Sequence, residues 1–264
     1  MTAQLQIKKV AILGAGVMGA QIAAHFSNAG FDVLLFDLAS KEGKLNALVE
    51  QSIKQLIKLK PSPLGQGSLA SNIHAKNYQA HVEELHDCDL IIEAVAERLD
   101  ITKSVYDTVS PHINSKAIFV TNTSGLSIND LAALLPLSMQ NRFCGVHFFN
   151  PPRYMHLLEL IPSDNTSPDC LNQLETFFVS FMGKGVIRAK DTPNFIANRV
   201  GVFSMLATVH HAKAFNIPFH IVDALTGALL GRPKSATFRT MDVVGLDTMM
   251  HVVNTMKTSL LDCP

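Results

Sequence analysis

A glycine-rich turn between two apolar runs constrains the fold of this chain more than any other feature. Residues 9–13 form a short, partly β-branched apolar run, and the G-x-G-x-x-G string of residues 14–19 follows it directly. A helical pattern then covers residues 18–28, and a second apolar run, residues 33–36, ends at Asp37. Because parallel strands need a crossover between them, this segment predicts a β-α-β unit.

Each glycine of the turn has a physical reason to be there. Gly14 allows the tight turn, Gly16 lets a pyrophosphate approach the backbone, and Gly19 lets the helix pack closely on the strand. Val17 and Met18 begin the helix, whose amino terminus directs partial positive charge at the phosphates. A glycine turn of purely structural use is the alternative, but the strand before it and the helix after it favour a dinucleotide site.

The cofactor choice depends on Asp37, the acidic residue that closes the second apolar run. A carboxylate at this position accepts hydrogen bonds from the adenine-ribose hydroxyls and repels a 2′-phosphate. The sequence therefore predicts NAD, rather than NADP, as the cofactor.

Apolar runs alternate with helical patterns up to about Lys190, where the character of the chain changes. Further strands are expected at residues 90–95, 117–121, 143–148 and 157–161. Helices alone are expected afterwards, at residues 194–215, 218–230 and 245–256. This order predicts an α/β fold with a Rossmann-type, doubly wound, mostly parallel sheet in domain 1–190, and a smaller all-α domain, 191–264, for substrate binding and dimerisation.

Between the second and third expected strands, residues 44–59 show the spacing of an amphipathic helix, and residues 61–71 are rich in Pro, Gly and Ser, which is typical of an exposed loop. The expected apolar face of that helix consists of Leu45, Leu48, Val49, Ile53, Leu56 and Ile57.

The composition argues against several classes of partner. Lys plus Arg and Asp plus Glu both number 22, so no overall charge attracts nucleic acid. No apolar run is long enough for a membrane span, and the amino terminus lacks the pattern of a signal peptide. Four cysteines without C-x-x-C spacing predict reduced thiols in a cytoplasmic protein and no metal site.

The strongest candidate for acid/base chemistry is His147, which lies near the end of the expected strand 143–148. Ligands of open α/β sheets bind beyond the carboxyl ends of strands. Glu159, in the next apolar strand, needs a partner to offset the cost of its burial, and the imidazole of His147 can be that partner. A structural glutamate that bonds to backbone groups is the alternative.

The sequence resembles the 3-hydroxyacyl-CoA dehydrogenase family over nearly its whole length. The motifs that carry the resemblance are the glycine-rich turn 14–19, IIEAVAE ending at Glu97, Asn122-Thr123-Ser124, HFFNPP with Glu159, Asp191-Thr192-Pro193 with Asn198, and Val244-Gly245-Leu246-Asp247.

The resemblance implies roles for the catalytic residues. His147 is the expected acid/base and Glu159 its orienting partner, while Ser124 and Asn198 hold the substrate oxygen and the histidine in register. From the residues alone, Ser124 could be an ordinary polar loop residue and Asn198 a packed, hydrogen-bonded amide.

The resemblance also implies contacts to both ligands. Glu97 and Asn150 are expected along the nicotinamide half of the cofactor. Lys103 is expected to contact the cofactor as well, although the segment Asp100-Ile101-Thr102-Lys103 departs from the family pattern and leaves Thr102 or Lys103 open. Lys58 and Lys60, together with Lys54, are candidates for the phosphates of coenzyme A. A solvated helix face explains these lysines equally well.

The function implied is NAD-linked interconversion of (S)-3-hydroxyacyl-CoA and 3-oxoacyl-CoA in fatty-acid β-oxidation. A dehydrogenase of free 3-hydroxy acids and a non-catalytic NAD-binding relative are the alternatives. Residues 231–239, GRPKSATFR, resemble the subgroup in which an enoyl-CoA hydratase-like region follows the dehydrogenase.

The last apolar helical segment leads to a further expectation about assembly. Because few residues follow it, we expect part of its stripe to be exposed or covered by a second chain, and hence a homodimer and an open reading frame that continues past Pro264. The stripe consists of Met249, Met250, Val252, Val253, Met256 and Leu260.

Overall fold

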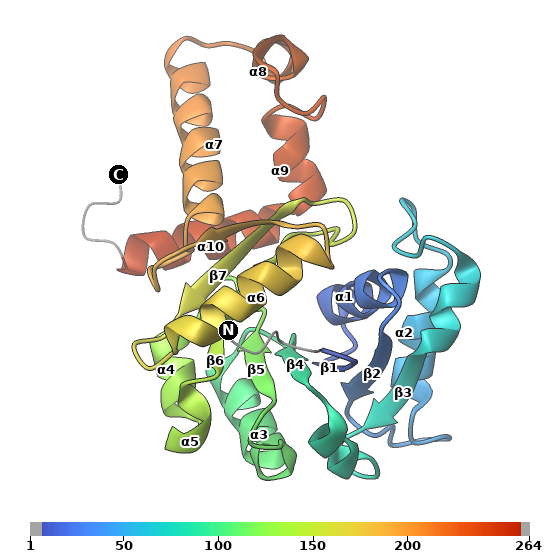
Figure 1. Cartoon of the computed structure of the whole chain (residues 1–264). Helices are drawn as coiled ribbons and strands as arrows, with labels where there is room; N and C mark the ends of the chain where they lie inside the picture. Colours follow the sequence, from blue (N-terminus) through green and yellow to red (C-terminus); the bar gives the residue numbers. More distant parts are fainter. Residues whose placement is uncertain (1–6, 260–264) are drawn as a thin grey trace. The chain divides into compact units, whose positions relative to one another are not determined.

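The structure, a computed structural model, describes residues 7–259. It divides into two compact units, Met1–Asp191 and Thr192–Pro264. The boundary lies next to the one expected from the sequence, between residues 190 and 191. The expected architecture is confirmed, because a Rossmann-type α/β unit precedes a helical unit (Figure 1).

The first unit is built on a single mostly parallel sheet. Neighbouring strands are parallel throughout, except that β6 and β7 are antiparallel. Within the described residues, the strands lie side by side in the order β3 (Ile73–Asn77), β2 (Asp32–Asp37), β1 (Lys9–Leu13), β4 (Leu90–Glu93), β5 (Ile118–Thr121), β6 (Phe143–Phe148), β7 (Leu157–Pro162) and β8 (Gly185–Arg188).

Both strands that sequence reasoning missed, β3 and β8, are the two edges of this sheet. The central strands are covered on both faces and therefore consist of continuous apolar runs. An edge strand has one neighbour only, and β3 (IHAKN) carries polar side chains that interrupt the pattern. The other edge strand, β8 (GVIR), is short and no residue of it is fully buried.

Helices cover both faces of the sheet. They are α1 (Val17–Asn28), α2 (Ala47–Leu56), α3 (Leu99–Val109), α4 (Ile128–Ala133), α5 (Leu137–Gln140) and α6 (Pro168–Ser180), with 3-10 turns η1 (Gly67–Asn72), η2 (Val82–Asp87) and η3 (Ser110–His112). On one face, Phe26 of α1 stacks on Phe177 of α6, with ring centroids 6.1 Å apart. On the other, Tyr106 of α3 packs against Phe119 at 4.9 Å.

The alternation of side chains along β6 and β7 decides which residues reach which face. Val146 and Phe148 belong to the core beneath α1 and α6, as do Leu158 and Leu160 of β7. Because successive side chains of a strand point to opposite faces, the residues between them, one from each strand, share the other face. That pair is His147 and Glu159.

Helix α2 is shorter than the sequence predicts. Residues 44–46 precede it and residues 57–59 follow it, and η1 forms inside the expected loop 61–71. Of the predicted apolar face, Val49 and Leu56 are buried and Ile53 is half-buried, whereas the other members are exposed. The prediction was wrong for Leu45, Leu48 and Ile57, because this helix offers only a narrow side to the sheet.

The second unit contains α7 (Ala197–Ala214), α8 (Phe219–Thr226), η4 (Ala228–Leu230), α9 (Phe238–Val244) and α10 (Leu246–Ser259). Helix α7 does not begin at residue 194, because Asn194 and Phe195 have φ angles of 60° and 50°, which are left-handed. The sequence analysis missed α9, which follows the GRPKSA segment. Its first N–H groups donate to the carboxylate of Asp223, a contact that sequence spacing does not reveal.

The sequence analysis expected few residues to cover the last helix, α10. Helix α7, earlier in the chain, covers part of it. Met249 is buried against Val202 of α7, and Val252 and Val253 are partly buried in the same cluster. Only Met250 of the described stripe is exposed by more than half. The side chains of Met256 and Leu260 lie outside the described residues.

None of the helices in residues 7–259 is both long and apolar enough to cross a bilayer.

Candidate active site

The glycine-rich turn has the shape that a dinucleotide requires. Its first glycine has a φ of +103°, and a Cβ there would lie 2.6 Å from the carbonyl oxygen of Ala94. A Cβ on Gly19 would lie 1.9 Å from the carbonyl oxygen of Gly14, so helix and turn touch through this position. A Cβ on Gly16 would meet nothing within 4 Å. The second glycine therefore faces open space, where a ligand can approach the backbone.

The start of α1 supplies the electrostatic complement for an anion. Gly16 is the N-cap, no side chain bonds to the free N–H groups, and the first turn contains no acidic residue. A helix amino terminus of this kind binds phosphate through its N–H groups and its dipole. Val17 is 70 % exposed beside it. The residues present thus fit the pyrophosphate of NAD.

Asp37 ends β2 beside this turn. Its carboxylate accepts hydrogen bonds from the main-chain N–H of Ala15 at 2.7 Å and of Leu38 at 2.7 Å. A carboxylate has about four acceptor sites, so these two bonds leave capacity for ribose hydroxyls. The side chain is half-buried, so part of the carboxylate remains accessible to a ligand.

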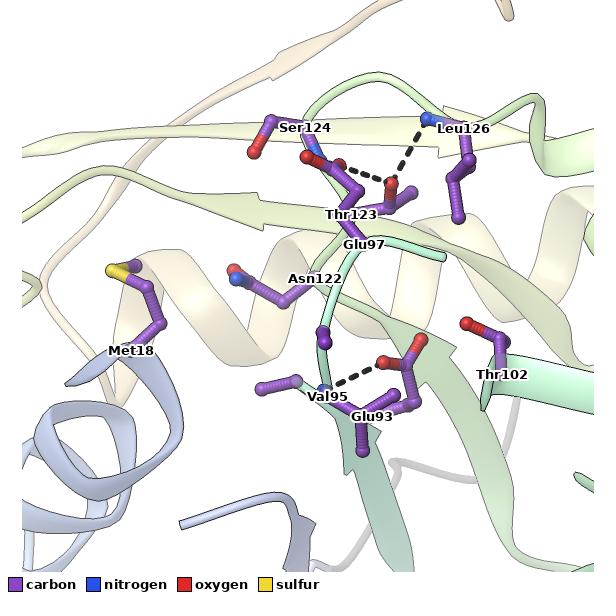
Figure 2. Close-up of a pocket in the computed structure, with 11 residues that line it drawn as sticks. Met18, Glu93, Val95, Glu97, Thr102, Asn122, Thr123, Ser124 and Leu126 are labelled. Carbon is purple, nitrogen blue, oxygen red and sulfur yellow. Dashed lines mark hydrogen bonds between the residues drawn. The ribbon is translucent and has the colours of Figure 1, made fainter. Parts of the chain in front are cut away.

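A small pocket, with a volume of about 190 Å³, opens at the carboxyl ends of β4 and β5 (Figure 2). Three of the predicted site residues, Met18, Glu97 and Ser124, line it, and they come from three different segments. Thr102, which the sequence analysis named together with Lys103, also lines it. The lining residues to which the sequence analysis gave no role are Glu93, Ala94, Val95, Ala96, Asn122, Thr123 and Leu126.

Glu97 organises the Thr123–Gly125 turn. Its Oε1 atom accepts hydrogen bonds from Thr123 Oγ1 at 2.6 Å, from the N–H of Ser124 at 2.5 Å and from the N–H of Gly125 at 2.9 Å. The carboxylate in Figure 2 points at this turn. The structure therefore gives Glu97 a positioning role for Ser124 in addition to its place on the pocket wall.

Glu93, the first glutamate of IIEAVAE, is a second carboxylate in this pocket and is almost fully buried. It accepts hydrogen bonds from Thr121 Oγ1 at 2.6 Å and from the N–H of Val95 at 2.7 Å. Burial raises the pKa of Glu93, and these two hydrogen bonds oppose that shift. A carboxylate within an apolar run was the signal that could have revealed it, as it did for Glu159.

Thr102 and Lys103, the two candidates left open by the sequence, face in different directions. Thr102 is buried and lines the pocket. The Lys103 ammonium forms an ion pair with Asp107, one turn further along α3, at 2.5 Å, and both side chains are more than half exposed. Lys103 does not line the pocket, because adjacent residues of a helix point about 100° apart.

The histidine and the glutamate predicted to act together are in contact. His147 Nδ1 lies 2.7 Å from Glu159 Oε2, His147 is 4 % exposed, and Glu159 is fully buried. The ring of Phe149 lies beside the imidazole, with centroids 4.4 Å apart. This geometry leaves Nε2 as the nitrogen directed away from the glutamate.

Asparagines connect β6 to its neighbours. Asn122, directly after β5, accepts a hydrogen bond from the N–H of Phe148 at 2.9 Å. It therefore ties the segment that bears Ser124 to the strand that bears His147. Asn150 is exposed and accepts a hydrogen bond from Gln21 of α1 at 3.2 Å. Asn150 does not line the small pocket.

The remaining candidates lie elsewhere. Lys58 and Lys60 are exposed in the segment after α2, as is Lys54 within that helix. Asn198 is half-buried in the first turn of α7, in the second unit. Asp191, the last residue of the first unit, accepts hydrogen bonds from the N–H groups that begin α4.

The sheet, the glycine turn and the acidic end of β2 define a Rossmann-type NAD-binding protein. The model of the 3-hydroxyacyl-CoA dehydrogenase NAD-binding domain matches residues 9–192, and that of the 3-hydroxyacyl-CoA dehydrogenase C-terminal domain matches residues 195–262. The chain belongs to the 3-hydroxyacyl-CoA dehydrogenase family.

Two curated relatives and one solved structure illustrate the similarity. A probable 3-hydroxyacyl-CoA dehydrogenase of Bacillus subtilis is 44% identical over 93% of this chain, but the chain spans only 33% of that protein. A protein of the same description from Deinococcus radiodurans is 39% identical over 94% of this chain and 72% of its own length. The crystal structure of (S)-3-hydroxybutyryl-CoA dehydrogenase from Ralstonia eutropha is 28% identical, with a TM-score of 0.80 over 97% of this chain and 89% of that one.

Proposed function

We propose that this chain catalyses the interconversion of a 3-hydroxyacyl-CoA and a 3-oxoacyl-CoA with NAD, and that His147 is its acid/base. The observation that carries this proposal is the buried 2.7 Å contact between His147 Nδ1 and Glu159 Oε2, at the carboxyl end of β6. A carboxylate at Nδ1 stabilises the tautomer and orientation in which Nε2 exchanges protons with a ligand.

The reaction needs a base for the hydroxyl proton and an acceptor for the hydride on the same carbon. NAD, when bound, supplies the hydride acceptor. Nε2 of His147 takes the hydroxyl proton during oxidation and returns it during reduction, while Glu159 stabilises the imidazolium by its charge. The hydroxyl of Ser124 and the amide of Asn198 are assigned to hold the substrate oxygen and the histidine.

The cofactor is assigned to the glycine turn and the small pocket. Gly14, Gly16 and Gly19 make room for the pyrophosphate, Asp37 accepts from the ribose, and Met18 and Glu97 border the nicotinamide end. Thr102 takes the place that was expected for Lys103, since it is Thr102 that lines the pocket. The assignment of Asn150 to the nicotinamide half of the cofactor rests on the family resemblance.

Exposed lysines near α2 are assigned to the coenzyme A part of the substrate. No ion pair in the described part of the chain includes Lys58 or Lys60, and a phosphate needs such cations. Charge reversal of both lysines is expected to raise KM for acyl-CoA with little change in kcat.

An NADH-linked assay tests the proposal against its two rivals. Acetoacetyl-CoA is expected to oxidise NADH, and free acetoacetate is expected not to. Turnover of free acetoacetate alone supports a dehydrogenase of free 3-hydroxy acids. NADH binding without turnover of either compound supports a non-catalytic NAD-binding relative. A series of acyl-CoA lengths then defines the chain-length preference.

We also propose a homodimer formed through the second unit. A hollow between α7 and α8 is lined largely by apolar side chains, among them Phe203, Phe215 and Leu225, each more than half exposed. Exposed apolar side chains that lie together commonly mark a protein–protein contact. Light scattering is expected to give twice the chain mass, and Phe203→Glu is expected to give a monomer that still binds NADH. A monomer for the unaltered chain contradicts the proposal.

Two further assignments concern the cell. A cytoplasmic location accords with Cys88, Cys144 and Cys170, which are buried free thiols. A hydratase-like region in the same polypeptide accords with the GRPKSATFR segment and with the greater length of the Bacillus relative. Cell fractionation and the sequence of the full transcript test these two assignments.

A further inference from the structure

A recess on the first unit contains a cation without a partner carboxylate. We call it the Arg153 recess, and it is lined by His25, Asn28, Gly65, Gln66, Leu69 and Arg153. His25 and Asn28 belong to the last turn of α1, at the opposite end of the helix from the glycine turn, so the recess is separate from the dinucleotide site. No ion pair in the described part of the chain includes Arg153.

The guanidinium of Arg153 is oriented by backbone groups. Nη1 donates to the carbonyl oxygens of Ser62 at 2.8 Å and Leu64 at 2.7 Å, and the group lies 5.4 Å from the ring centre of Tyr154. Tyr154 itself donates to the carbonyl of Ser62 at 2.9 Å. Nη2 lies toward Gly65, where a Cβ would be 3.8 Å away. The charge is therefore presented in a fixed direction, which favours recognition of a planar or tetrahedral anion.

His25, which lines the recess, has a lowered pKa. Burial first, and then the positive charges of Lys184 and Arg153, together lower its pKa from 6.5 to about 4. The backbone of Met182 acts in the opposite direction. Both ring nitrogens are buried, and neither has a side-chain or backbone partner in good hydrogen-bond geometry among the described residues. A neutral imidazole has one donor and one acceptor to offer to a ligand.

The position of the recess connects it with the proposed substrate. Gly65 and Gln66 line it a few residues after Lys58 and Lys60, and Arg153 bonds to the carbonyls of Ser62 and Leu64 in between. Arg153 belongs to the loop that follows the strand of His147. A ligand that extends from the carboxyl end of β6 toward those lysines therefore passes Arg153. Coenzyme A is such a ligand, because it carries a 3′-phosphate and a diphosphate at the end remote from the thioester.

We propose that the Arg153 recess is an anion subsite that binds a phosphate group of the coenzyme A part of the substrate. The assignment rests on the proposed function, which it deepens. Arg153 supplies the charge and Gln66 a neutral hydrogen-bonding group, whereas the Asn28 amide holds the wall in place through its bonds to Pro63 and Gly65.

Charge changes at Gln66 test the subsite without removing the bonds that Arg153 makes. Gln66 is exposed and its side chain caps no helix. Gln66→Glu is expected to raise KM for acetoacetyl-CoA by about tenfold, and Gln66→Lys is expected to leave KM unchanged or lower. Arg153→Gln is expected to act like Gln66→Glu. Lys116→Gln, an exposed cation before β5, is the matched control and is expected to change nothing.

Truncated substrates identify the phosphate. With acetoacetyl-pantetheine, which has no nucleotide, the Gln66 variants are expected to match the unaltered protein. If the change in KM of the Gln66 variants disappears with acetoacetyl-dephospho-CoA, the recess binds the 3′-phosphate. If the change in KM persists with this substrate, the recess binds the diphosphate. Equal KM values for all variants with acetoacetyl-CoA overturn the subsite while leaving the proposed function intact.

A binding measurement separates the two proposals if no thioester is turned over. Free coenzyme A is expected to raise the pKa of His25, followed by NMR, because an anion beside Arg153 favours the imidazolium. Pantetheine is expected to leave it unchanged. An unchanged His25 pKa with saturating coenzyme A overturns the subsite, whatever the activity.

Discussion

His147 and Glu159 lie directly opposite each other in the antiparallel pair β6 and β7, so the strand register itself sets their 2.7 Å contact. The backbone on both sides is buried, and neither side chain needs a flexible loop to reach the other. Groups located on strands are positioned more accurately than groups on loops, which suits an acid/base residue.

The first prediction is that His147→Gln lowers kcat by about 10²–10⁴-fold, the usual contribution of a positioned acid/base. Binding of NADH, followed by fluorescence titration, is expected to be nearly unchanged, because the glycine turn lies on β1 and α1. Glu159→Gln is expected to slow turnover as well, through loss of imidazole orientation and basicity. Near-normal turnover of His147→Gln contradicts the mechanism proposed above.

The second prediction separates two glycines of the same turn. Gly16→Ala is expected to fold normally and to lose about tenfold or more in NAD affinity, because its methyl group meets no protein atom and enters the phosphate space. Gly19→Ala is expected to lower the free energy of unfolding by about 1–3 kcal/mol, because its methyl group meets the carbonyl of Gly14. Thermal unfolding and NADH titration of both variants provide the check, and the reverse pattern counts against the assignment.

The third prediction concerns cofactor choice at Asp37. Asp37→Asn retains an acceptor for the N–H of Ala15 but removes the charge. The ratio of kcat/KM for NADP to that for NAD is expected to rise by about tenfold, because a like-charge contact costs more than 1 kcal/mol. If the unaltered protein already uses both cofactors equally, Asp37 does not select between them.

The fourth prediction concerns Lys103, which pairs with Asp107 and does not line the pocket. Lys103→Gln is expected to leave the KM for NAD within about twofold and to change stability by less than about 1 kcal/mol, the usual range for an exposed ion pair. A large rise in the KM for NAD restores Lys103 to the cofactor site.

The fifth prediction follows from the pKa of His25, which the fold lowers from 6.5 to about 4. Below about pH 6.5 the unfolded chain binds a proton that the folded chain does not bind until about pH 4. The free energy of unfolding therefore decreases as the pH is lowered from 6.5 to 4. Between pH 7 and pH 5, His25→Gln is expected to lose less free energy of unfolding than the unaltered protein, by up to about 2 kcal/mol. Urea unfolding at the two pH values measures it, and equal losses for both proteins contradict the assignment.

The sequence analysis identified the parts whose signal is local. The β-α-β unit of residues 9–37 is a continuous pattern, and β6 carries its own apolar run, so both were recognised. Helix α9 and the edge strand β3 were not recognised, because one depends on Asp223 and the other on pairing with β2. Contacts distant in the sequence leave no periodicity to detect.

The sequence by itself determined the fold class, the glycine turn with Asp37, and the histidine with a glutamate that needed a partner, because each follows from residue type, spacing or the cost of burial. Only the tertiary structure decided that Glu97 holds the turn of Ser124 by hydrogen bonds. It alone also decided that Thr102 and not Lys103 lines the pocket, and that Glu93 lines the same pocket. The physical reason is that a pocket at the carboxyl edge of a sheet is assembled from the ends of strands far apart in the chain, and the direction of each side chain there depends on packing.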